Sequence, residues 1–400
     1  MPTANHAVTN RNPGKPAELK LPLILLCLAP LMFQRLSLLW APRYLYDFIS
    51  YWVSGKLYLA GANPYDSGAI FAMEKAQGWH YTIPMTTYCP PWSMPLLVLS
   101  AMAAMNVSRA IWFAISLTID CGAAVALWRY YGGAARRRWI ALLVCASFIA
   151  MGVAEFLGQV TPLMLLALTA FLWLTRWKRY FWAGLALWGL GAKPHLLYLF
   201  FLAVLLWAVQ NRVWKMLAGA ALSYGVATAG AIAGNLDTVH FLNSSLKAAL
   251  EIFCGVGGVL RQIFGTQHHW LQFLPCLLGL VWFAWYWKRN RKNWDWGEHL
   301  PFLLVVSIAS SPYFWFHDFV LILPALIRFA AGRAYRSFDV MVLFVLVQEV
   351  VQLCYSPSTT VWMGVGSLLW IPFCLVGERW LRKTRALERT ENAPETAYAV

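Results

Sequence analysis

The sequence predicts an all-α protein that crosses a membrane many times within a single domain. The 400-residue chain is 60% hydrophobic, has a mean hydropathy of +0.55 and contains only 12% charged residues. Soluble proteins contain about a quarter charged residues. Several apolar runs approach the roughly 20 residues that a helix needs to cross a bilayer. These runs are continuous and do not alternate with polar residues, so an outer-membrane β-barrel is excluded.

A polar cytoplasmic tail is expected over residues 1–19, since no small-residue cleavage site of a signal peptide follows it. One transmembrane domain is expected over residues 20–377. The polar end, residues 378–400, is expected to be a disordered cytoplasmic tail. The apolar runs predict about twelve transmembrane helices: 20–40, 109–129, 139–156, 159–175, 180–192, 195–209, 213–233, 271–288, 299–310, 316–330, 335–354 and 359–377.

The distribution of lysine and arginine predicts the orientation, because cytoplasmic loops of membrane proteins are enriched in both. Most of the 32 basic residues fall on one side if Pro90–Met105 is a short helix at the outer interface. A full span there would place most later basic clusters outside. Both termini are therefore expected in the cytoplasm, with loops 41–108 and 234–270 on the outer side and short interfacial helices in the first. Orientation accounts for the net charge of +15, so nucleic acid is not an expected partner.

The polar residues that interrupt the apolar runs gather on this expected outer side. They predict a water-filled cavity that opens outward. A carboxylate there is able to deprotonate a hydroxyl while neighbouring cationic groups bind a phosphate. The sequence contains no Asp-x-Asp, phosphate-loop or His-Glu-x-x-His motif, so no metal or other cofactor is expected. The set is Asp47, Asp66, Tyr88, Glu155, Gln159, Lys193, His195, Arg261, His317 and Asp318.

Five segments, in order along the chain, resemble glycosyltransferase family 87. The likeness covers about residues 20–330. That family contains polyprenyl-phosphate-mannose-dependent α-mannosyltransferases of bacterial envelopes and belongs to the C-type membrane glycosyltransferase superfamily. The segments are "DFISYWVSGKLYLAGANPYD", "YCPPWSMPLLVLSAM", "GQVTPLMLLAL", "GLALWGLGAKPHLLYLF" and "SPYFWFHDFVLILPAL".

The resemblance implies a C-type glycosyltransferase fold and an inverting hexosyltransferase, most simply an α-mannosyltransferase. The donor would be a polyprenyl phosphate sugar, and the acceptor a glycolipid, a glycan or a protein at the periplasmic face of the bacterial inner membrane. The resemblance also implies that Asp47 is the catalytic base. Lys193, Arg261 and His317 match basic positions of the family. The chain departs from the pattern at Phe316, where the family commonly has an Asp, and an acid stands instead at Asp318.

Each of these residues also has a plainer structural explanation. Asp47 could pair with Arg43 or Arg35, or cap a helix. Lys193 could snorkel toward lipid headgroups, and His195 could simply pack. The outer aromatic residues fit an interfacial belt as well as sugar stacking. They are Tyr46, Tyr51, Trp52, Tyr88 and Trp92.

Two other functions fit the composition. A flippase or transporter of lipid-linked oligosaccharides would place polar groups through both leaflets and often carries an inverted repeat, and no repeat is visible. A glycan polymerase would use a pyrophosphate-linked oligosaccharide as donor. The lipid bilayer is the expected environment, and no obligatory protein partner is inferred. Cys89 and Cys254 fall in the outer loops and could pair in an oxidising compartment.

Overall fold

The computed structural model describes residues 46–241, 254–332 and 368–391, together with residues 347 and 366. All the elements that these residues form are helical. The prediction of a helical membrane protein is confirmed at this level. The predicted span 20–40 lies outside the described residues, as do 335–354 except residue 347, and residues 359–365 and 367 of the last predicted span.

The first expected outer loop folds into short helices, as predicted. They are α2 (Phe48–Leu59), α3 (Ser67–Ala76), the 3-10 turn η1 (Pro91–Ser93) and α4 (Met94–Ala101). Asp66 begins α3, where its carboxylate accepts a hydrogen bond from Ala69 N at 2.8 Å. The residues of η1 and α4 are too few to cross a hydrocarbon core of about 30 Å. The segment 90–105 is therefore a short helix here and not a full span.

Two described helices are long and apolar enough to cross a membrane by length and composition. They are α5 (Met105–Tyr130) and α11 (Trp214–Gly234). A third span is counted if η2 (Ala135–Arg137) and α6 (Arg138–Ser147) form one unit with α7 (Ile149–Leu157), which bends from them by 60°. The number twelve stays a prediction.

The remaining helices are shorter, and several are broken. Helix breaks lie at Lys193, between the expected spans 180–192 and 195–209, and at residues 310–315, between the expected spans 299–310 and 316–330. The elements are α8 (Thr161–Arg176), α9 (Tyr180–Ala186), η3 (Leu187–Ala192), η4 (Pro194–Leu197), α10 (Tyr198–Gln210), η5 (Leu236–His240), α13 (Val256–Phe264), η6 (His269–Gln272), α14 (Leu274–Asn290), η7 (Arg291–Asn293), α15 (Trp296–Ala309), η8 (Phe316–Ile322), α16 (Leu323–Ala331) and α19 (Trp370–Glu391).

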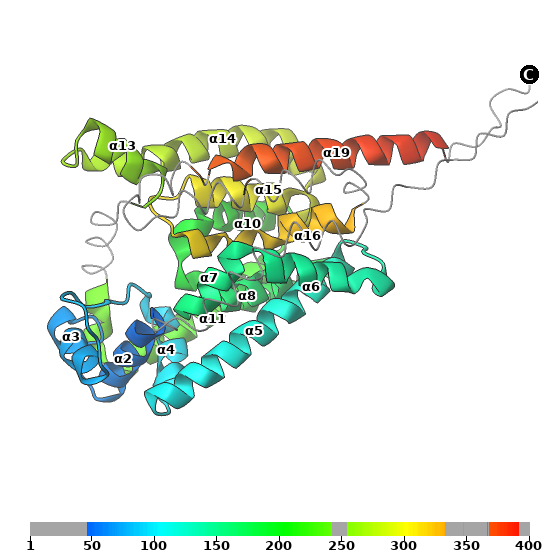
Figure 1. Ribbon diagram of the computed structural model, residues 1–400. Helices are drawn as coiled ribbons and strands as arrows, with labels where there is room; N and C mark the ends of the chain where they lie inside the picture. The colour runs from blue at the N-terminus through cyan, green and yellow to red at the C-terminus, as the bar shows by residue number, and fades with distance from the viewer. Residues whose placement is uncertain (1–45, 242–253, 333–346, 348–365, 367, 392–400) are drawn as a thin grey trace, which may run out of the picture.

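The elements of the two expected outer loops lie toward one end of the helical bundle. Figure 1 shows α2, α3 and α13 there, whereas α19 runs toward the opposite end. The helix α19 continues to Glu391, so the expectation of disorder from residue 378 onward was wrong for this stretch. The physical reason is composition, because Leu, Arg, Lys, Ala and Glu dominate the segment and are strong helix formers.

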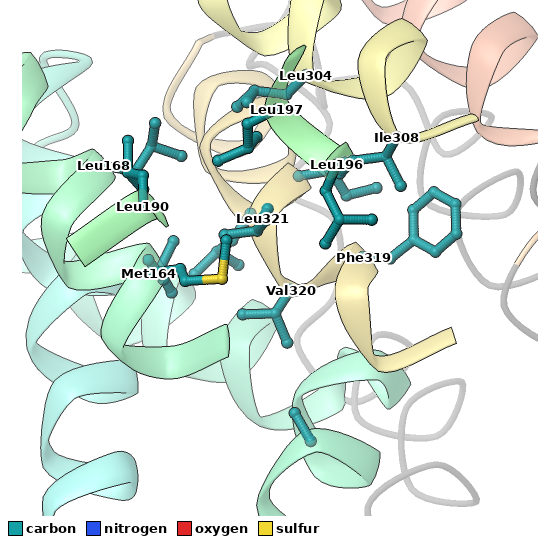
Figure 2. Packing of buried hydrophobic residues seen from close by; sticks show 14 of the residues in the cluster. Met164, Leu168, Leu190, Leu196, Leu197, Leu304, Ile308, Phe319, Val320 and Leu321 are labelled. Carbon is teal, nitrogen blue, oxygen red and sulfur yellow. The ribbon is translucent and has the colours of Figure 1, made fainter. Parts of the chain in front are cut away.

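The hydrophobic core packs the two broken helices against each other. Figure 2 shows leucines of η4 facing apolar side chains of η8, with α8 and α15 beside them. The labelled residues are fully or almost fully buried, and close packing of this kind holds helices together where lipid supplies no hydrophobic driving force. The core thereby fixes the positions of Lys193, just before η4, and of His317 and Asp318 at the start of η8.

Several aromatic side chains that suggested an interfacial belt instead pack inside the protein or hydrogen-bond its backbone. Tyr51 and Trp52 are buried. Trp92 Nε1 donates to the carbonyl of Gly191 at 2.8 Å, and Trp188 Nε1 donates to the carbonyl of Trp92 at 2.7 Å. A Cβ at Gly191 would lie 2.7 Å from Trp92 Nε1, so only glycine allows this approach. The contact pins η1 to the segment that carries Lys193.

Candidate functional site

Asp47 stands at the start of α2 and is held there by its backbone. Its N–H donates to the carbonyl of Leu157 at the end of α7, at 2.8 Å, and its own carbonyl accepts from Ser50 Oγ at 2.8 Å. Its side chain makes no capping hydrogen bond to α2. The carboxylate is thus turned away from its own helix and toward the centre of the bundle. Arg43 and Arg35, the alternative partners, lie outside the described residues.

Gln159 connects Asp47 to the rest of the site. Its Nε2 donates to Asp47 Oδ2, and its Oε1 accepts from Lys193 Nζ at 2.9 Å and from Tyr51 OH at 3.1 Å. Two donors on the amide oxygen leave the amide nitrogen facing the carboxylate. Gly158, which precedes it, has a left-handed backbone with φ of 72° and ends α7. That conformation favours glycine and turns the chain so that Gln159 enters the site.

Lys193 lies at the centre of the cluster, in the break between η3 and η4. Its ammonium contacts Asp318 Oδ1 at 2.6 Å and His317 Nε2 at 3.2 Å, in addition to Gln159. The Lys193 side chain is 16% exposed and that of Asp318 is 1% exposed. Asp318 Oδ2 accepts from Trp315 N at 2.8 Å, which caps η8. Five residues from four separate segments therefore form one hydrogen-bonded cluster, which we call the outer cluster: Asp47, Gln159, Lys193, His317 and Asp318.

The environment of Asp47 makes it a stronger base than an ordinary aspartate. Loss of water around the half-buried carboxyl is the largest effect and raises its pKa, while the hydrogen bond from Gln159 and the charge of Lys193 lower it. The charge of Asp318 raises it again, and the resulting pKa is about 6. At neutral pH the group is mostly ionised, and its affinity for a proton is higher than usual.

His195 lies beside the outer cluster. Its ring stacks on Tyr313 with 4.1 Å between the ring centres. Its Nε2 is buried and has no hydrogen-bond partner among the described residues. Tyr88, also predicted as a site residue, is half-buried, and no described hydrogen bond joins it to the cluster. Cys89 and Cys254 are free, buried thiols.

Arg261 is placed differently from the other predicted residues. It is buried in α13, where its guanidinium donates to the carbonyl of Thr266 at 2.8 and 3.1 Å and to Gln272 Oε1 at 3.1 Å. Gln272 Nε2 in turn donates to the carbonyl of Pro312 at 2.5 Å. These bonds brace the loop that leads into η8, and so connect Arg261 to the segment that carries His317 and Asp318.

Tyr51 contributes to the cluster although sequence reasoning treated it only as part of an aromatic patch. It lies four residues after Asp47, which places both on the same face of a helix. That spacing was the available signal. Among the described residues no group of three or more His, Cys, Asp or Glu side chains is arranged to hold a metal ion.

The fold and the site define a helical membrane protein with a buried, charged cluster where two broken helices meet. Comparison of the chain with protein-family models, with curated proteins and with solved structures gives no match. The functional interpretation therefore rests on the residues themselves.

Proposed function

We propose that this protein is an inverting membrane glycosyltransferase. It would transfer a hexose, most simply mannose, from a polyprenyl phosphate to a glycolipid, glycan or protein at the periplasmic face of the bacterial inner membrane. One observation carries the proposal: a basic carboxylate, Asp47, is joined through one amide to the ammonium of Lys193. Glycosyl transfer from a phosphosugar needs one base and one cation in this proximity.

In the proposed reaction Asp47 accepts the proton of the acceptor hydroxyl. The acceptor oxygen then forms a bond to the anomeric carbon as the bond from that carbon to the phosphate oxygen breaks. The electron pair of the broken bond leaves with the polyprenyl phosphate. Attack opposite the leaving group inverts the configuration, so a β-linked donor gives an α-linked product.

Lys193 would stabilise the departing phosphate. All its described acceptors are protein atoms, so the phosphate oxygen must replace one of them. His317 Nε2 is the longest of the three contacts at 3.2 Å, and a neutral imidazole is a weaker partner for an ammonium than a carboxylate. The donor phosphate would therefore take the place of His317, whose ring would remain beside it as a second polar contact.

The test is transfer from labelled polyprenyl-phosphate-mannose by the full chain in lipid nanodiscs, compared between the wild-type protein and Asp47→Asn. The variant is expected to form no product while inserting and melting normally. Asp66→Asn is the matched control, because Asp66 undergoes the same chemical change at a helix start outside the outer cluster and is expected to keep full activity. Normal turnover by Asp47→Asn would refute the proposal.

The same assay distinguishes the two other functions. A polymerase would prefer a pyrophosphate-linked oligosaccharide, so competition by that compound and not by the monosaccharide donor would identify it. A flippase would move labelled lipid across the bilayer of a proteoliposome without forming a glycosidic bond.

A further inference from the structure

The charge of Lys193 is already balanced within the protein. An ammonium has three N–H donors, and Lys193 Nζ has three acceptors, on Gln159, His317 and Asp318. The only carboxylate among them is that of Asp318, at 2.6 Å. Asp47, the other carboxylate of the outer cluster, receives its hydrogen bond from a neutral amide.

Asp318 is the most deeply buried member of the cluster. Its side chain is 1% exposed, and one of its oxygens is fixed by the backbone N–H of Trp315. The next residues, Phe319, Val320 and Leu321, are buried in the core shown in Figure 2. The carboxylate therefore has a fixed position, and Lys193 on its longer side chain is drawn to it.

The position of Lys193 decides how basic Asp47 is. A direct ion pair with an ammonium lowers the pKa of a carboxyl by about 1–3 units, which would make Asp47 a poor proton acceptor. With Lys193 drawn toward Asp318, the amide of Gln159 stands between the ammonium and Asp47. Other titratable groups on the elements around Asp47 are Tyr51 on its own helix, Glu155 on α7, Cys89 before η1, His195 on η4 and His317 on η8.

We propose that Asp318 is a positioning residue that draws Lys193 away from Asp47 and so preserves the basicity of Asp47. This inference rests on the proposed function in one respect: the proposed reaction is the reason that Asp47 needs to be basic. The electrostatic arrangement is a property of the protein alone and is measured without substrate. It also gives the acid at position 318 a role that the resemblance left unassigned.

The experiment measures the ionisation of Asp47 directly. The infrared band of its protonated carboxyl is isolated in full-length protein in nanodiscs by subtracting the spectrum of Asp47→Asn, and is followed from pH 4 to 8. Asp318→Asn keeps an oxygen for the N–H of Trp315 and replaces the charged acceptor of Lys193 with an uncharged NH2 group. In this variant Lys193 turns toward Asp47, and the midpoint is expected to fall from about 6 by about one pH unit.

The same substitution in a Lys193→Met protein distinguishes an effect through the position of Lys193 from a direct effect of the Asp318 charge on the pKa of Asp47. With Lys193→Met, the same Asp318→Asn change is expected to move the midpoint by less than half as much, because no ammonium is left to move. Equal shifts in both backgrounds, or no shift in the first, would overturn the proposal. Asp66→Asn serves as the control and is expected to leave the midpoint unchanged.

Folding of the variants is checked by their melting transitions. If Asp318→Asn does not fold, Asp318→Ser also removes the charge and keeps a capping oxygen, and the same pair of backgrounds applies. Because the infrared midpoint needs no donor, a failure to find glycosyl transfer would refute the proposed function without affecting this result. A normal transferase with an unmoved midpoint would refute the inference alone.

Discussion

Two buried ion pairs involve residues of the consecutive helices η8 and α16, and the two pairs serve different purposes. At the start of η8, Asp318 pairs with Lys193, which in turn contacts the amide that holds Asp47. Further along, in α16, Arg328 pairs with Glu378 of α19 and donates to the carbonyl of Glu298 in α15 at 2.8 Å. We call this second group the inner pair.

In the inner pair Arg328 contacts a carboxylate of α19 and a backbone carbonyl of α15, and so ties three helices together. The outer cluster has two carboxylates for one ammonium, and one of those carboxylates is paired only with an amide. A structural tie has no use for an extra, basic carboxylate, whereas a proton-transfer site needs one. Burial and charge alone therefore do not distinguish a functional site from a structural ion pair. In the outer cluster the distinguishing feature is the second carboxylate, which is paired with an amide and not with the ammonium.

The largest expected effect is on transfer by Asp47→Asn. A positioned general base contributes about 10²–10⁴-fold to a rate, and the variant is expected to lose at least that factor. The melting temperature should hold or rise, since an amide removes a half-buried charge. The prediction is tested by measuring the initial rate of transfer and the melting temperature on the same preparation of the variant. If a fall in stability explained the lost activity, Asp47 would be a structural residue like those of the inner pair, and this prediction would be wrong.

Glu378→Gln is expected to lower stability and to leave catalysis unchanged, the opposite of Asp47→Asn. It leaves the buried Arg328 charge without its carboxylate and should destabilise the fold by about 3–5 kcal/mol. Activity per folded molecule should be unchanged. Thermal unfolding measures the loss, and Arg328→Met combined with Glu378→Leu should recover most of it, because an apolar pair can replace a buried ion pair. A stable Glu378→Gln variant would contradict this view of the inner pair.

The third prediction is a pH dependence. Only ionised Asp47 accepts a proton, and its pKa is raised to about 6. The value of kcat/KM should therefore be flat near neutrality and fall below pH 6, approaching tenfold per unit. The sign for stability is the reverse: a carboxyl pKa raised by folding favours the folded state at low pH, and this contribution is lost as pH rises through 6. A profile that stays flat to pH 5 would exclude Asp47 as the base.

The smallest effect is expected from Asp66→Ala. The change removes the oxygen that accepts from Ala69 N at the start of α3 and should cost about 1 kcal/mol. Transfer should be unaffected, and Asp66→Asn should restore the lost stability. A large loss of activity in a folded Asp66→Ala protein would mean that the site extends beyond the outer cluster to the start of α3.

The sequence predicts the local features of this fold well. The apolar runs identify α5 and α11, and the polar breaks at Lys193 and before His317 appear where Pro, Gly and charged residues interrupt those runs. The short helix before Met105 follows from the later basic clusters, which a full span there would place outside. The spans and breaks depend on local composition, and the short helix on the distribution of charge along the chain, both of which a single sequence displays.

The partnerships could not be predicted, because they depend on distant segments. Nothing local indicates that Gln159 faces Asp47, or that Arg261 braces the loop before η8. Arg328 is one of the 32 basic residues whose distribution predicts the orientation, yet it is buried against Glu378. Charge counting treats every arginine alike, whereas tertiary packing decides which ones are paired.

The bend between α6 and α7 has a consequence for the spacing of the chain. The 60° change of direction at Phe148 aims α7 so that its last carbonyl, on Leu157, receives the backbone N–H of Asp47. One inserted or deleted residue within α7 would rotate that carbonyl by about 100° and displace it by about 1.5 Å. The number of residues between Phe148 and Leu157 is thus constrained as firmly as the identity of any residue in the cluster, even though that stretch contributes no side chain to it.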